Sequence, residues 1–285
     1  MSCENIRLSC PMNKRAVLIS LLAILYGGAM VVYWFNLGFT NALLRETIYL
    51  STSCIATIAG FFALRKFGFA HPRSLTLLLL TVGMGYWWMG EMLFDYYQYI
   101  VHSNPFPSAA DIFYILGYFF MLIGLVNEIR IVKINWALLE KPVLFLYGLV
   151  ALLFVLLISY FGIYHAYEPT KTFFVNAIGM GYGIGDLLLI LTNIFVLILV
   201  WEFRGGRFAR VWVCLFLSFI FLLVADILFA MYADQYNAQV WFYKSLLDSF
   251  WMGAYVVFGY ALFEFGFSIE DIYKKLRDQQ KQVIS

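Results

Sequence analysis

Gly90-Glu-Met-Leu-Phe-Asp-Tyr-Tyr97 lies between two long apolar runs and is followed by His102-Ser-Asn-Pro-Phe-Pro-Ser-Ala-Ala-Asp111. We interpret this stretch as a turn between two membrane helices. Its three acids, Glu91, Asp95 and Asp111, have no Lys or Arg among them. Acidic side chains at the edge of the hydrocarbon are costly and usually mark a functional site.

Composition places the rest of the chain in a membrane as well. Hydrophobic residues make up 63% of the sequence and charged residues 13%, and uncharged runs of about 17 to 25 residues are typical of transmembrane helices. We therefore predict an all-α polytopic membrane protein. Its eight transmembrane helices are expected at residues 16–36, 46–64, 74–97, 110–127, 142–165, 172–201, 211–232 and 240–264.

The basic residues predict which way these helices run. Cutting the chain at the predicted helices puts 16 of the 19 Lys and Arg residues on alternate segments, and only Arg45, Lys171 and Lys244 on the others. By the positive-inside rule, we expect a multi-pass cell-membrane protein with both termini in the cytoplasm. Anionic lipid suffices to explain the basic inner face, so the lipid bilayer is the expected partner and nucleic acid is not.

The predicted domain organisation has three parts. Residues 1–15 form a cytoplasmic N-terminal tail, residues 16–266 the eight-helix transmembrane domain, and residues 267–285 a short cytoplasmic helix. A Ser268-x-x-Asp271 capping box is expected to begin that last helix. Its positions 269, 272, 276, 279 and 283 follow three-four spacing, which fits either a coiled-coil homodimer or an amphipathic helix lying on the inner leaflet.

Depth along the helices assigns the candidate site. Six acids from five helices are expected in the outer half of the membrane, and we predict that they line one outward-open cavity with nearby aromatic residues. Acids together with aromatic faces suit an organic cation or a small amphipathic molecule. The predicted ligand-binding residues are Glu91, Asp95, Asp111, Asp186, Asp226, Asp248, Tyr114, Tyr182 and Trp251.

Several of these acids also have purely structural interpretations. Glu91 and Asp95 are four residues apart, so one is protonated or a positive charge lies near them. Asp111 follows Ser108 in a capping-box pattern that would begin a helix. Lys244 and Asp248 are also four apart and can neutralise each other. The aromatic residues can equally serve as the interfacial belt and as packing.

Two further patterns concern the helices themselves. Gly179, Gly181, Gly183 and Gly185 alternate just before Asp186, which predicts a thin, irregular entry to that helix with backbone facing a cavity. Ala110-Asp111-Ile112 is echoed by Ala225-Asp226-Ile227. This echo indicates repeated helical hairpins.

Catalytic and metal-binding signatures are weak. Of the three histidines, His71 and His102 lie outside the predicted spans and His165 is the last residue of one. They form no zinc-ligand pattern, which argues against a buried zinc hydrolase and leaves any metal or cofactor unknown. Hard cations and protons remain open as ligands of the acids. The cysteines, Cys3, Cys10, Cys54 and Cys214, are interpreted as structural thiols.

One resemblance rests on Pro105-Phe-Pro-Ser-Ala-Ala-Asp111-Ile-Phe-Tyr114, with the later Gly-x-Gly-Asp186 and Ala-Asp226. Over roughly residues 74–264, the chain resembles the multi-helix membrane sensor domains that precede diguanylate cyclase or histidine kinase modules in bacteria and archaea. The resemblance implies a prokaryotic sensor unit whose C-terminal helix leads to an output module. The sequence departs from that pattern because it reaches Ser285 without a kinase or cyclase. A cytoplasmic signalling partner, or an output domain outside this sequence, is then expected.

These observations favour a membrane sensor or binding module with an acidic, aromatic pocket. A cation or proton-coupled transporter or channel is the alternative, and an integral membrane enzyme comes third. A carrier needs polar groups through the inner half of the membrane, where the sequence offers little beyond Asn193 and Ser218. That asymmetry favours a pocket open to one side.

Overall fold

The computed structural model describes residues 14–35, 42–132, 141–200 and 207–284, and the regular structure in these ranges is helical. Eight of the described helices are long and apolar enough to cross a membrane. They are α1 (Lys14–Trp34), α2 (Ala42–Phe67), α3 (Arg73–Asp95), α4 (Ala109–Val132), α5 (Lys141–Ile158), α6 (Phe173–Val200), α7 (Arg207–Asn237) and α8 (Trp241–Ile284). Short π-helices extend α3 and α5, namely η1 (Tyr96–Val101) and η2 (Ser159–Tyr164). Each predicted span overlaps one of these helices.

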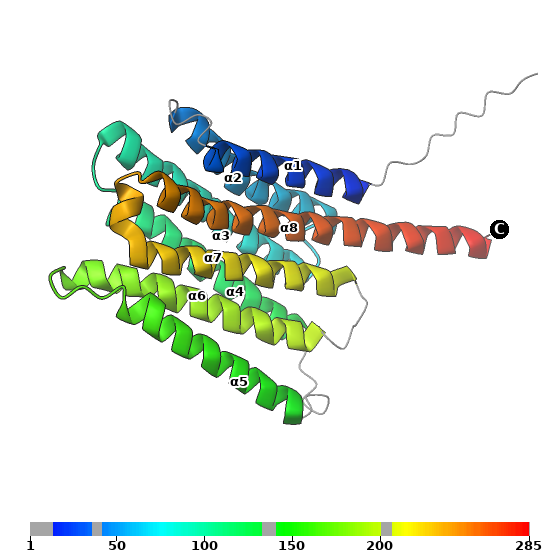
Figure 1. Cartoon of the computed structure of the whole chain (residues 1–285). Coiled ribbons are helices and arrows are strands. Elements are labelled where there is room, and N and C mark those ends of the chain that lie inside the picture. The colour runs from blue at the N-terminus through cyan, green and yellow to red at the C-terminus, as the bar shows by residue number, and fades with distance from the viewer. Residues whose placement is uncertain (1–13, 36–41, 133–140, 201–206, 285) are drawn as a thin grey trace, which may run out of the picture.

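Six of the helices form a closed ring. In the order α2, α3, α4, α6, α7, α8, each helix contacts the next, and α8 contacts α2 again. The helices α1 and α5 pack outside this ring, α1 against α8 and α2, and α5 against α6 (Figure 1). In the apolar window of α5 only 6% of the residues are buried, against 72% in α8. The helix α8 is thus the most enclosed and α5 the most peripheral.

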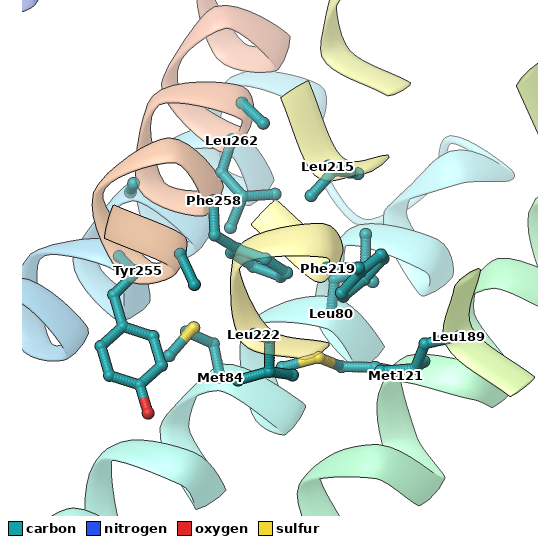
Figure 2. Packing of buried hydrophobic residues seen from close by; sticks show 14 of the residues in the cluster. Leu80, Met84, Met121, Leu189, Leu215, Phe219, Leu222, Tyr255, Phe258 and Leu262 are labelled. Atoms are coloured by element: carbon teal, nitrogen blue, oxygen red, sulfur yellow. The ribbon is translucent and has the colours of Figure 1, made fainter. Parts of the chain in front are cut away.

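Apolar side chains fill the middle of the ring. Met84 of α3, Met121 of α4 and Leu222 of α7 meet there, beside Phe219 and Phe258 (Figure 2). Four of these five are at most 1% exposed, and Leu222 is 4% exposed. Closely packed interiors of this kind leave few voids larger than a water molecule.

Glycines allow a close approach of two helices within the ring. A Cβ on Gly83 of α3 would lie 2.9 Å from the carbonyl oxygen of Gly117 on α4, and a Cβ on Gly117 would lie 3.0 Å from the Gly83 carbonyl oxygen. Small residues at such crossings let membrane helices pack backbone to backbone. The hairpin of α3 and α4 is therefore tightly closed below the predicted site.

Successive helices run in opposite directions, so the two ends of the bundle differ (Figure 1). We call one end of the bundle the tail end; α1 and α7 begin there and α8 ends there. The opposite end, where α8 begins, is called the cavity end. Buried acids at the tail end are neutralised. Glu264 lies 2.8 Å from Arg15, and Glu128 lies 2.8 Å from Arg73.

The C-terminal segment is not a separate helix. The helix α8 runs without interruption from Trp241 to Ile284, 44 residues, so no helix begins at Ser268 and the predicted boundary between residues 266 and 267 falls inside it. Ser268 is 1% exposed, and its hydroxyl lies 3.5 Å from Glu264 rather than on a free backbone N–H. The predicted capping box is wrong because the apolar face of α8 continues past this point. Ile269 still packs in the core.

The glycine-rich part of the sixth helix also differs from its prediction. Gly179 to Gly185 lie inside the regular helix α6, which begins at Phe173, so the predicted irregular entry is wrong. Gly179 and Gly183 do line the cavity described below. The predicted structural thiols Cys3 and Cys10, and most of the predicted N-terminal tail, lie outside the described residues.

Candidate functional site

A cavity of about 140 Å³ lies inside the ring at the cavity end. The helices α3, α4, α6, α7 and α8 all contribute to its wall. Apart from His165 and Glu168 near the surface, the acidic and aromatic side chains in that wall are Trp87, Glu91, Phe94, Phe106, Asp111, Tyr114, Tyr118, Tyr182, Asp186, Asp226, Phe229, Tyr236, Trp251 and Tyr255. Leu222 belongs both to the wall and to the apolar core, so the core forms the floor.

The cavity reaches the surface beside the segment that joins η2 to α6. His165, Glu168 and Lys171 line it there and are exposed. Lys171 pairs with Glu168 three residues before it. Within the described lining, His165 and Lys171 are the basic residues, so the basic side chains lie at the mouth, and every acid except Glu168 lies deeper.

Glu91 on α3 is held by two tyrosines from other helices. Tyr114 of α4 donates to Oε2 at 3.0 Å, and the hydroxyl of Tyr255 on α8 donates to Oε1. Glu91 is 7% exposed. Both carboxylate oxygens therefore have donors, and the residue connects α3, α4 and α8.

Asp111 has the structural role that its sequence context predicts, and it also faces the cavity. Its Oδ2 accepts the backbone N–H of Ser108 at 2.6 Å, while the Ser108 hydroxyl accepts the N–H of Ala110 at 3.1 Å. This reciprocal pattern confirms the capping box at the start of α4. Oδ1 of Asp111 accepts the hydroxyl of Tyr182 on α6.

Asp186 on α6 and Asp226 on α7 form a pair around a single hydroxyl. Tyr118 of α4 places its hydroxyl oxygen 2.8 Å from Oδ1 of Asp186 and 2.9 Å from Oδ2 of Asp226. The indole N–H of Trp251 on α8 donates to Oδ1 of Asp226 at 2.8 Å. We call these two acids the aspartate pair. It joins four helices of the ring.

The two remaining predicted acids do not line the cavity. Asp248 lies 3.2 Å from Lys244, the neutralising pair that the four-residue spacing allowed. Lys244 also donates to the hydroxyl of Tyr236 at 2.8 Å, and Tyr236 donates to Oδ1 of Asp248 at 2.8 Å. Since Tyr236 lines the cavity, this hydroxyl connects the two regions.

This second region is a buried ion-pair network, formed by Arg45 and Glu46 of α2 with Lys244 and Asp248 of α8. Arg45 lies 3.0 Å from Glu46, and Lys244 lies 3.6 Å from Glu46. Asp95, one turn beyond Glu91, has Glu46 and Lys244 as its strongest charged neighbours. The prediction of one cavity holding all six acids is therefore wrong for Asp95 and Asp248, because Asp248 pairs with Lys244 and Asp95 lies beside the same network.

Comparisons of the chain with protein-family models, with curated proteins and with solved structures gave no match. The geometry of the site therefore carries the functional argument.

The structure brings together seven of the nine predicted residues, namely Glu91, Asp111, Asp186, Asp226, Tyr114, Tyr182 and Trp251. Sequence reasoning missed Tyr118, the residue that joins the aspartate pair. Helical spacing could have found it, because Asp111, Tyr114 and Tyr118 are separated by three and four residues and share one face. Tyr255 follows Trp251 by four residues, so these two side chains also share one helix face.

The chemistry available to the cavity is recognition by hydrogen bonding and charge. Its four deeper acids, Glu91, Asp111, Asp186 and Asp226, are surrounded by phenol and indole groups, which supply donors and aromatic faces. Among the described residues, no group of three or more His, Cys, Asp or Glu side chains is placed to hold a metal ion. The arrangement suits a small polar molecule that carries positive charge.

Proposed function

We propose that the protein is a membrane receptor whose cavity binds a small molecule and whose helix α8 carries the response to the tail end. The observation that supports this most strongly is that one helix serves both parts. Trp251 and Tyr255 of α8 donate to cavity acids, and the same helix continues to the exposed residues 272–282. A ligand that displaces either donor acts directly on the signalling element.

The proposal includes an orientation in the cell membrane. The tail end carries most of the basic residues, as in Lys14, Arg65, Lys66 and Arg73. By the positive-inside rule this end faces the cytoplasm, with both termini inside and the cavity open to the outside. Reporter fusions after residues 40, 104, 168 and 236 should be external, and fusions after 70, 134, 206 and 285 cytoplasmic. Two adjacent loops on the same side would overturn this topology.

A cation or proton carrier is the second candidate, because acids outnumber bases in the cavity. A carrier also needs polar groups toward the tail end. The hydroxyl of Ser218 is bonded to the carbonyl of Ala254 at 2.8 Å, and Asn193 is buried within apolar helix. With Met84, Met121 and Phe219 filling the ring, these isolated groups support a one-sided pocket better than a pathway. Ion flux into liposomes would favour the carrier.

The receptor proposal is tested by perturbing the cavity and measuring the tail. Trp251→Phe removes the indole donor to Asp226 while keeping an aromatic ring. Spin labels at positions 70 and 275, on an otherwise cysteine-free chain in nanodiscs, report the distance between the α2–α3 loop and the tail. We expect Trp251→Phe to shift or broaden that distance distribution.

Trp34→Phe is the matched control. The Trp34 indole donates to the hydroxyl of Ser249 at 3.0 Å, which also ties it to α8, but Trp34 does not line the cavity. Its loss should leave the distribution unchanged. Equal distributions for both variants and the parent would refute coupling between cavity and tail.

A further inference from the structure

Asp186 is the cavity acid with the fewest donors. No described group donates to its Oδ2, although the residue is only 2% exposed and lines the cavity. Its Oδ1 depends on the hydroxyl of Tyr118, which also lies 2.9 Å from Asp226. A phenol has one hydrogen and serves one carboxylate at a time. Asp226 has the indole of Trp251 as a second donor, whereas Asp186 has no second donor among the described residues other than its neighbour Asp226.

A buried acceptor without a donor is unfavourable, and two neighbouring carboxylates repel each other. Among the described residues that line the cavity, no basic side chain lies at this depth. Lys171 lies at the mouth and pairs with Glu168, and Lys244 is engaged by Asp248 and Tyr236. A group that brings both a positive charge and N–H donors would satisfy both carboxylates.

We propose that the aspartate pair binds the ammonium group of a small primary or secondary amine. This inference rests on the proposed receptor function and names the ligand class. One N–H points to Oδ2 of Asp186 and another to Asp226, as charge-assisted hydrogen bonds. Since the pair and its donors Tyr118 and Trp251 come from α6, α7, α4 and α8, the bound amine connects four helices, including the one that forms the tail.

Oδ2 of Asp186 needs a hydrogen-bond donor, and this requirement distinguishes an amine ligand from other cations. A quaternary ammonium brings charge but no N–H, so Oδ2 of Asp186 stays without a partner. A divalent metal such as Ca²⁺ takes six to eight oxygen ligands, more than the pair provides. A neutral alcohol can donate one hydrogen bond but leaves the repulsion between the two carboxylates.

The experiment uses the full chain in nanodiscs and isothermal titration with three matched compounds: 2-phenylethylamine, its N,N,N-trimethyl derivative and 2-phenylethanol. We expect the amine to bind about tenfold or more tightly than either of the others. Asp186→Asn and Asp226→Asn should each weaken amine binding by about tenfold or more. Asp234→Asn, an exposed acid near the end of the same helix as Asp226, should have no effect.

Circular dichroism melting shows which variants remain folded, and the two aspartate variants provide independent tests. Similar affinities for all three compounds would overturn the amine assignment and leave the cavity a ligand site. Absence of amine binding, or amine binding unchanged in folded Asp186→Asn and Asp226→Asn, also overturns it. The receptor function fails separately, if the spin-label distances show no coupling between cavity and tail.

Discussion

Gly183 of α6 lies directly against Gly162 of η2, backbone to backbone. A Cβ on Gly183 would come within 2.9 Å of the carbonyl oxygen of Gly162. Both glycines line the cavity, so this contact sets how closely the end of the peripheral helix α5 approaches the ring. The absence of two side chains therefore shapes one wall of the site.

Gly183→Ala tests this contact. The added methyl has no space, and overpacking of this kind typically costs about 1–3 kcal/mol of the free energy of unfolding. Gly181→Ala is the matched control, since a Cβ there has nothing within 4 Å, and alanine gains about 0.5–1 kcal/mol in helix propensity. Thermal unfolding in detergent should rank Gly181→Ala above the parent and Gly183→Ala below it. The opposite order would mean that the two backbones do not touch.

The buried network makes a second prediction. Lys244→Met would leave Glu46 and Asp248 without their shared cation, which lies 3.6 and 3.2 Å from them. Breaking a buried pair in this way typically costs about 3–5 kcal/mol of stability. Lys244→Met with Asp248→Leu should recover much of that loss, because Arg45 still pairs with Glu46 at 3.0 Å.

The control for this pair of variants is Lys171→Met. Its partner Glu168 and Lys171 itself are exposed, and exposed ion pairs contribute about 0–1 kcal/mol. Chemical unfolding of the four proteins gives the comparison. A single Lys244→Met variant as stable as Lys171→Met would show that Asp248 and Glu46 are not confined beside that lysine.

The sequence could predict where the helices lie and how deep their acids are, but not which way each helix faces. The lengths of the apolar runs predicted all eight helices. The position of the acids, near one end of those helices, predicted an acidic layer. The rotation of each helix about its axis was not accessible, because nearly every face is apolar. Asp248 could therefore not be assigned to Lys244 or to the cavity from spacing alone.

Local patterns were more reliable where they involve the backbone. The Ser108-x-x-Asp111 box formed as predicted, because a polar loop precedes it and leaves the first N–H groups of α4 without helix partners. The same pattern at Ser268 failed, because residues before it already form helix and no free N–H groups remain. A capping motif predicts a helix start only where the preceding chain is not helical.

Asp111 makes a third prediction, which separates its two roles. Asp111→Ala removes the acceptor for the Ser108 N–H and for the Tyr182 hydroxyl, and loss of a helix cap costs about 0.5–2 kcal/mol. Asp111→Asn keeps a carbonyl oxygen for the Ser108 N–H while removing the charge. Thermal melting should therefore place the Asn variant clearly closer to the parent than the Ala variant. Equal losses in both would assign the stabilisation to the charge instead of the cap.

The tail of α8 makes the last prediction. The helix continues straight out of the bundle along its own axis (Figure 1), which favours a projecting helix over one lying flat on the membrane. Ile269 is 6% exposed and packs in the core, so it cannot belong to the predicted coiled-coil seam, the face through which two copies would pair. Ile272 and Leu276 are 39% and 51% exposed and remain available to a second copy. The side chain of Val283 lies outside the described residues.

If two copies pair through this face, position 272 of one copy approaches position 272 of the other, and the same holds for position 276. Position 274 points away from the second copy. Single cysteines at 272 and 276, in a chain without other cysteines, should crosslink in native membranes far more than a cysteine at 274. Gln279 on the same face weakens the seam, as polar seam residues do, so Gln279→Leu should strengthen crosslinking at 276. Equal crosslinking at all three positions, or none at any of them, would leave the tail a single helix and require a different partner for the output of the receptor.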